Sequence, residues 1–211
     1  EVAAAYDADD LFVSLQNRIS KVGLRVKPVE SGEVFMSIAA YRTVDGVEVR
    51  ELATLTSADT VTLTFNEAST NMEFSFTGNP ELSLAPAEWV KINWSGTRFA
   101  SEEDQVPGLI QVVGKGEDFT TTLSNPAGKW YRFGQIQLKA GKKTSSVPAG
   151  IMVTNRVRMH DEYLYGLGEV PSSWPAAALQ AQVVAARSYA YYDLYQKNKF
   201  DTDGTPKKAS R

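Results

Sequence analysis

The residues of this sequence that best suit catalysis are one glutamate in a glycine-containing loop and one arginine on the helix expected to follow it. Glu169 lies between Gly168 and Val170-Pro171, and glycine lets a backbone turn sharply beside a bulky ligand. Apolar neighbours such as Leu167 and Trp174 would favour the neutral form of the carboxyl group, which a general acid needs at neutral pH. The alternative is a surface glutamate near a helix start, stabilised by the helix dipole.

A long alanine-rich helix is expected to position Arg187. Ser172 or Ser173 can cap its start, and Pro175 suits the first turn, where its missing N–H does no harm. Alanine is a strong helix former and allows close packing. The stripe expected to be buried, at helical spacing, consists of Leu179, Val183, Ala186, Ala190 and Leu194. A second stripe consists of Gln180, Val184, Arg187 and Tyr191.

The small residues on several sides of this helix predict that other elements enclose it. Arg187 would then face an anionic partner or a groove, because a buried cation needs one. The alternative is a structural ion pair with Asp161, Glu162 or Glu169. Spacing alone does not choose between these two interpretations.

Other reactive side chains offer less. The sequence has no cysteine, and His160 is the one histidine, which argues against disulfides and against a zinc site. Ser172, Ser173 and Ser188 lack the surroundings of a catalytic serine. We therefore expect neither a metal nor a cofactor, and we interpret His160 as a bystander.

The first half of the chain predicts β-structure. Apolar and polar residues alternate in short runs that are separated by turn signals, and Val44-Asp45-Gly46-Val47 is a typical hairpin turn. The clearest runs are 24–27, 34–38, 61–65, 72–76 and 90–94. Many short strands at regular spacing favour a sandwich or a barrel-like unit. Two or three further strands between 130 and 157 precede the helix, so the expected fold class is α+β.

A domain boundary is expected at Asn125-Pro126-Ala127-Gly128, which gives domains of 1–126 and 127–211. The first 126 residues hold 19 acidic and 9 basic residues, and the remainder holds 6 acidic and 13 basic residues. The carboxy-terminal part should therefore attract anions, such as nucleic acid or an acidic cell-wall polymer. No stretch approaches the roughly 20 apolar residues that span a bilayer.

The segment from Tyr163 to Ala190 resembles the signature of the SpoIID/LytB family, the stage II sporulation D proteins and amidase enhancers. That pattern is roughly Y-L-x-G-V, then E-M-P-x-S-[WF], then A-L-x-A-Q-A-V-A-A-R-[TS]-Y-A. The resemblance covers about residues 130–211. It implies a secreted domain that is exported to the cell wall and acts on peptidoglycan. The sporulation members of the family are lytic transglycosylases.

By this resemblance Glu169 matches the catalytic acid, and Arg187 matches an arginine implicated in activity and substrate engagement. Gln182 matches another position of the pattern. The expected substrate-binding residues are Arg187, Gln180, Gln182, Ser173 and Tyr191. Gln180 stands where sporulation members often carry lysine, and the loop before Glu169 is about two residues shorter than theirs. The sequence stops before the downstream half of the family pattern, so the domain is expected to be truncated at its carboxy-terminal end.

Two functions from different classes follow. The first is cleavage of glycan strands by one carboxylate, because a lytic transglycosylase uses the sugar's own C6 hydroxyl as nucleophile whereas ordinary glycosidases use two carboxylates. The second is a glycan-binding protein without catalysis that stimulates a cell-wall amidase, with residues 1–126 as the docking module. Binding of nucleic acid by the basic half is a weaker third interpretation.

Overall fold

The computed structural model describes residues 10–101, 105–114, 129–165 and 173–196. The chain divides into two compact units. One unit is Phe12–Val157, and the other combines the first eleven residues with Arg158–Arg211. Among the described residues, no helix combines the length and the apolar character needed to cross a membrane.

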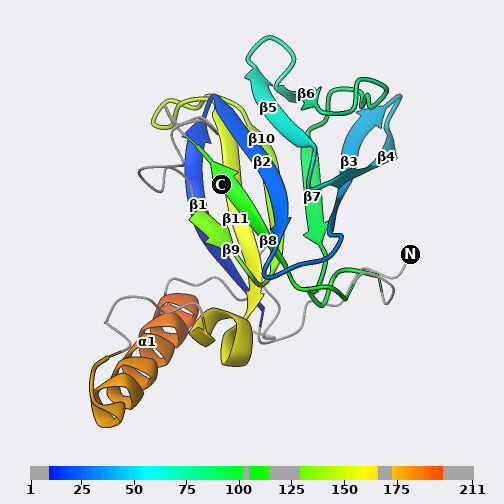
Figure 1. Cartoon of the computed structure of the whole chain (residues 1–211). Coiled ribbons are helices and arrows are strands. Elements are labelled where there is room, and N and C mark those ends of the chain that lie inside the picture. The colour runs from blue at the N-terminus through cyan, green and yellow to red at the C-terminus, as the bar shows by residue number, and fades with distance from the viewer. Residues whose placement is uncertain (1–9, 102–104, 115–128, 166–172, 197–211) are drawn as a thin grey trace. The chain divides into compact units, whose positions relative to one another are not determined.

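Two antiparallel sheets form the larger unit (Figure 1). In spatial order, the six-stranded sheet is β1 (Asp10–Ile19), β11 (Gly150–Arg158), β10 (Gln135–Gly141), β7 (Trp89–Trp94), β3 (Phe35–Val44) and β4 (Val47–Thr56). The five-stranded sheet is β6 (Asn71–Thr77), β5 (Thr60–Asn66), β2 (Lys21–Pro28), β8 (Gly108–Val113) and β9 (Lys129–Tyr131).

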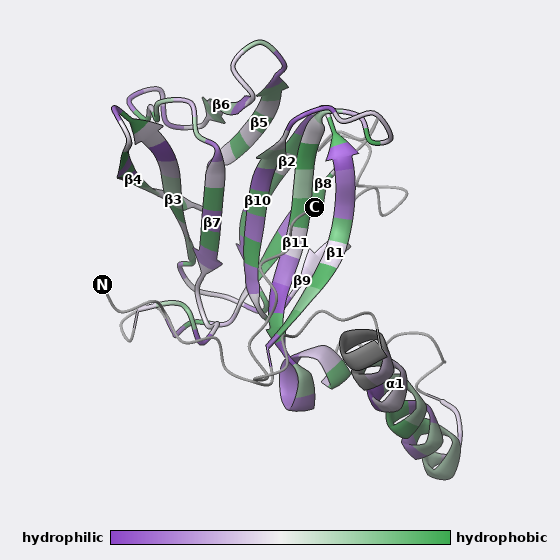
Figure 2. Cartoon of the chain, turned by 180° about the vertical axis from the view of Figure 1, so that it is seen from behind, coloured by the Kyte–Doolittle hydropathy of each residue, from purple (hydrophilic) through white to green (hydrophobic). Residues whose placement is uncertain are grey.

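The alternation of side chains explains why these segments form strands. In β7 the buried residues are Val90, Ile92 and Trp94, and the residues between them are only partly buried. Figure 2 shows such alternation as green and purple bands along the strands. Buried side chains of both sheets join one hydrophobic core, and each fully buried large side chain contributes roughly 1.5–3 kcal/mol. The expected β-rich fold is confirmed, and its form is a sandwich.

The hairpin expected at Asp45-Gly46 is also confirmed. It joins β3 to β4, and the two residues have φ values of 50° and 78°. A two-residue turn with positive φ at both positions matches the twist of the strands that it connects. Glycine adopts such a φ without steric cost, and aspartate does so more readily than most residues.

The strands after residue 128 pair with strands that lie before residue 114. β9 pairs with β8, and β10 pairs with β7 on one side and with the following strand β11 on the other. The compact β unit therefore continues to Val157, whereas the expected boundary lay between 126 and 127. The difference arises because these last strands complete the two sheets instead of beginning a new unit.

The smaller unit contains a π-helical turn, η2 (Met159–Tyr163), and the helix α1 (Ala176–Gln196). The long helix was expected and is present. The prediction that other elements enclose it is wrong for the described side chains. Val183 and Val184 are 37% and 54% exposed, and Tyr189 is exposed as well. The helix forms despite this exposure because it is rich in alanine, whose high intrinsic helix propensity supports a helix that buries little of its surface.

Candidate functional site

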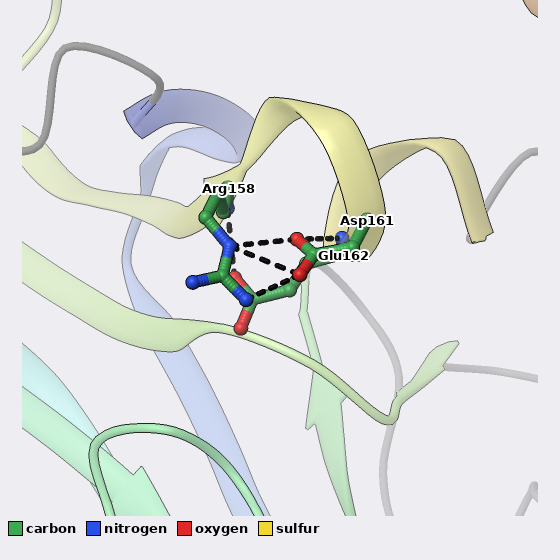
Figure 3. Close-up of polar contacts among 3 residues, drawn as sticks. All are labelled: Arg158, Asp161 and Glu162. Atoms are coloured by element: carbon green, nitrogen blue, oxygen red, sulfur yellow. Dashed lines mark hydrogen bonds and ion pairs between the residues drawn. The ribbon is translucent and has the colours of Figure 1, made fainter.

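An ion pair closes the turn that leads from the sandwich into the smaller unit's sequence. Arg158, at the end of β11, keeps an extended backbone with φ −80° and ψ 134°. Its Nε donates hydrogen bonds to both carboxylate oxygens of Asp161, at 2.9 and 3.0 Å. A terminal guanidinium nitrogen also donates to Asp161 (Figure 3). Such two-point contacts between guanidinium and carboxylate are strong and directional.

Glu162 completes the same cluster. Its side chain is buried, and its Oε2 accepts a hydrogen bond from the backbone N–H of Arg158 at 2.7 Å. The backbone N–H of Glu162 donates to Oδ1 of Asp161, also at 2.7 Å. A side-chain carboxylate that returns to the N–H at the start of a helical turn acts as in a capping box. Both acidic residues therefore hold the turn in its conformation.

The electrostatics of the turn fix the protonation of Asp161. The hydrogen bonds from Arg158 lower the pKa of its carboxyl from 3.8 to about 2, and the backbone N–H of Glu162 contributes to the shift. A carboxylate with so low a pKa is ionised at neutral pH and has no proton to donate. Asp161 is thus a structural anion. Its partner is Arg158, not the Arg187 that spacing allowed.

The helix α1 begins directly after Pro175, whose carbonyl oxygen accepts hydrogen bonds from the backbone N–H groups of Ala178 and Leu179. Ser173 lies in an exposed turn two residues before that proline. Pro175 therefore opens the first turn of the helix, as the sequence predicted. The turn leads the chain directly into the helix that carries the other candidate residues.

The expected substrate-binding residues of α1 do not share one face. Gln180 and Arg187 are exposed, and a spacing of seven residues puts them on the same side of a helix. Gln182 is half-buried, and a step of two residues puts it on nearly the opposite side from Gln180. Tyr191 follows Arg187 by four residues, which continues the first face, although its side chain lies outside the described part.

The packed side of α1 agrees with the expected stripe at Leu179, Ala186 and Ala190 and differs at Val183, which is 37% exposed. The least exposed positions that the structure describes there are Ala178, Leu179, Gln182, Ala186 and Ala190. Ala178 and Gln182 join the expected residues on this side of the helix. Glu169, the candidate acid, lies outside the described residues.

No group of three or more histidine, cysteine, aspartate or glutamate side chains suited to a metal ion occurs within the described ranges. His160 is exposed on η2. The cluster of Arg158, Asp161 and Glu162 was missed by sequence reasoning. Its one signal was the spacing of three residues between an arginine and an aspartate, which brings side chains together on a helical turn.

Comparison with protein families gives one match. Residues 149–210 match the family SpoIID, described as stage II sporulation protein. The matched stretch contains all of β11, the η2 turn and α1, and it confirms the resemblance seen in the signature around Glu169 and Arg187. It covers less than a third of the chain and leaves most of the sandwich outside. No curated protein and no solved structure matches this chain.

Proposed function

We propose, from the SpoIID match of residues 149–210, that this protein acts on peptidoglycan at the cell wall as a lytic transglycosylase. The matched family is related to sporulation and to the cell wall. The choice of reaction is supported by the hydrogen bonds that two acidic residues accept near the start of the matched stretch. Asp161 and Glu162 are both held by Arg158, so neither is proposed as a catalytic acid, and the family signature points to Glu169.

The proposed reaction needs one group that first gives and then takes a proton. Glu169 protonates the glycosidic oxygen as the bond to C1 breaks. The resulting carboxylate then accepts the proton of the sugar's C6 hydroxyl as that oxygen attacks C1. The product is a 1,6-anhydro sugar at the new end of the strand. Inverting and retaining glycosidases instead use a second carboxylate, about 5–10 Å from the first.

The exposed face of α1 supplies the proposed contacts with the glycan. Arg187 would bind an acidic or acetamido group of the strand, since guanidinium hydrogen bonds to anions are directional and strong. Gln180 extends this face along the helix axis, and Tyr191 is a further contact proposed from the sequence. Ser173 offers a hydroxyl before the helix. Gln182, on the packed side, would instead position the helix.

A second candidate function is binding without cleavage, in which the protein presents glycan to a cell-wall amidase. The exposure of Arg187 and Gln180 favours it equally, because an open face binds an extended strand without needing a catalytic acid. Both candidates imply an exported protein that works at the cell wall. They differ in the chemistry expected of Glu169.

The test uses glycan strands freed of stem peptides. Wild-type protein should release 1,6-anhydro-muramyl products, detected by mass spectrometry, and Glu169→Gln should abolish release while glycan pull-down persists. Binding by both proteins without release from wild type would overturn the enzyme and support the amidase activator. If heparin competes with the glycan for binding and muropeptides do not, nucleic acid would instead be favoured as the partner.

A further inference from the structure

A row of four side chains crosses the outer face of the six-stranded sheet. Arg50 on β4 is the register partner of Tyr41 on β3. Tyr41 is also the partner of Trp89 on β7, and Trp89 is the partner of Lys139 on β10. Neighbouring strands lie about 4.8 Å apart, so these four residues, here called the aromatic row, extend over roughly 14 Å.

The aromatic row points away from the core. The residues beside three of its members in sequence, Ala40, Val90 and Leu138, are buried in the core. Side chains alternate between the two faces of a strand, so Tyr41, Trp89 and Lys139 lie on the other face. Arg50 and Lys139 are exposed, and the two rings are half-buried. The row thus presents a cation at each end and two rings between them.

The two rings form one continuous surface with a third cation above it. The ring centroids of Tyr41 and Trp89 are 5.3 Å apart, and the ring planes are inclined by 32°. Nζ of Lys91 lies 4.4 Å from the ring centroid of Trp89 and 5.4 Å from that of Tyr41. Partial burial lowers the pKa of Lys91, and the charge of Arg156 lowers it further. An anion placed here would offset both effects.

Hydrogen-bonded amides hold the sheet face beside the row. Nε2 of Gln137 donates to Oε1 of Gln135 at 2.8 Å, and Nε2 of Gln135 donates to Oδ1 of Asn93 at 2.7 Å. Gln135 and Gln137 are buried although they lie on the outer face. A buried polar chain with these bonds made is rigid. The side chains next to it are therefore ordered before any ligand arrives, which reduces the entropy lost on binding.

This face of the sheet is positively charged, although the chain as a whole is negatively charged. On the outward positions of β3, β4, β7, β10 and of β11 up to Arg156, the cations are Arg50, Lys91, Lys139 and Arg156. The carboxylates are Glu48 and, just before β7, Glu88, which accepts a hydrogen bond from Oγ1 of Thr43 at 3.5 Å. The chain as a whole has a net charge of −3. A positive face with exposed ring surface fits an acidic polymer whose units can lie flat on aromatic rings.

We propose that the aromatic row and Lys91 form a docking surface for a glycan strand that carries carboxylates. Its sugar rings would lie across Tyr41 and Trp89, and its acidic groups would reach Lys91 and the two terminal cations. The choice of peptidoglycan freed of stem peptides, whose lactyl carboxylates are exposed, rests on the proposed function. The surface itself lies before residue 149, outside the family match.

The experiment measures binding of the full chain to such strands in a Glu169→Gln background, which prevents any cleavage from consuming the ligand. Trp89→Ala should weaken binding about tenfold or more, as for a central aromatic contact. Lys91→Met should weaken it several-fold and reduce its dependence on salt. Neutral chitin oligosaccharides should bind more weakly than the acidic strand.

Matched controls lie on the other sheet, where Nζ of Lys27 is 4.3 Å from the ring centroid of Trp130. Trp130→Ala and Lys27→Met should change binding less than twofold. Equal losses for Trp89→Ala and Trp130→Ala, equal binding of chitin, or equally effective competition by single-stranded DNA would each overturn the proposal. If Trp89→Ala does not fold by circular dichroism, the double variant Lys91→Met, Lys139→Met decides by the same criteria.

Failure of this surface and failure of the proposed function are distinguishable. Should the wild type release no anhydro product, the comparison between Trp89→Ala and Trp130→Ala is unaffected. Should Trp89→Ala bind as the wild type does, release of product that depends on Glu169 still supports the transglycosylase.

Discussion

Arg158 and Asp161, three residues apart, form a two-point ion pair that fixes the π-helical turn after β11. The same arginine offers its backbone N–H to Glu162. One residue thus engages two carboxylates through different atoms. The consequences for stability and for pH dependence can be measured separately, because the two acids differ in burial and in the bonds that they accept.

Asp161→Asn should reduce stability modestly at neutral pH. Both side chains of the pair are more than a third exposed, and solvent-exposed ion pairs contribute about 0–1 kcal/mol. Because the pKa of Asp161 is lowered to about 2 in the folded protein, its contribution is fully present above about pH 4 and is lost as pH falls toward 2. Urea unfolding at pH 7 and at pH 2 checks this.

For Asp161→Asn, the difference from wild type should shrink as the pH falls. Glu48→Gln is a suitable control, because it removes an exposed carboxylate on β4, away from this turn. A difference that stays constant from pH 7 to pH 2 would show that the ionised carboxylate is not what stabilises the turn.

Glu162→Ala should have a larger effect than Asp161→Asn. Glu162 is buried, and its removal leaves the N–H of Arg158 without the carboxylate that it bonds at 2.7 Å. An unsatisfied buried donor costs about 1–3 kcal/mol. The measurement is amide hydrogen exchange at Arg158, which should become faster. Glu162→Gln keeps an acceptor oxygen and should retain part of the protection, and unchanged exchange in the alanine variant would contradict this role.

Arg187→Met separates binding from folding. The side chain is exposed on α1, so its replacement should change the free energy of unfolding by no more than about 0.5 kcal/mol. Binding to acidic glycan should weaken and become less sensitive to salt. Lys142→Met, at an exposed cation between β10 and β11, is the matched control. Equal losses of affinity in both variants would assign the effect to overall charge alone.

Gly46→Ala should destabilise the β3–β4 hairpin by about 1 kcal/mol. Gly46 has φ 78° and nothing within 4 Å of the position where a Cβ would stand, so the cost is backbone strain and not a clash. Gly46→Asn should be tolerated better, since asparagine adopts this conformation more easily. Thermal unfolding compares the two variants, and equal melting temperatures would refute the strain argument.

Sequence reasoning predicted the sandwich well because its strands alternate cleanly, as Trp89 to Trp94 illustrate, and because Asp45-Gly46 marks a turn. It also found the helix and the signature of the matched family. It gave no indication that the observed β unit runs to Val157, where pairing between β10 and β7 joins segments more than 40 residues apart. Such long-range pairing leaves no local mark in the sequence.

The candidate site was predicted less completely. The family pattern names Glu169 and Arg187, and helical periodicity predicted the packing of Leu179, Ala186 and Ala190 but not the exposure of Val183. The π-helical turn was not expected, since Met159–Tyr163 is too short for a periodic signal. The row from Arg50 to Lys139 was also missed, because it joins four strands through register and not through spacing along the chain.

The adjacency of β1 and β11 has a consequence for how the protein is made. The earliest strand finds its neighbour only after a ribosome has translated more than 130 further residues. Until then β10 has an open edge, and nascent chains with such edges are prone to associate with one another. Completion of the sandwich must therefore wait for the synthesis of β11, and chaperone binding during translation should favour the interval before β11 emerges.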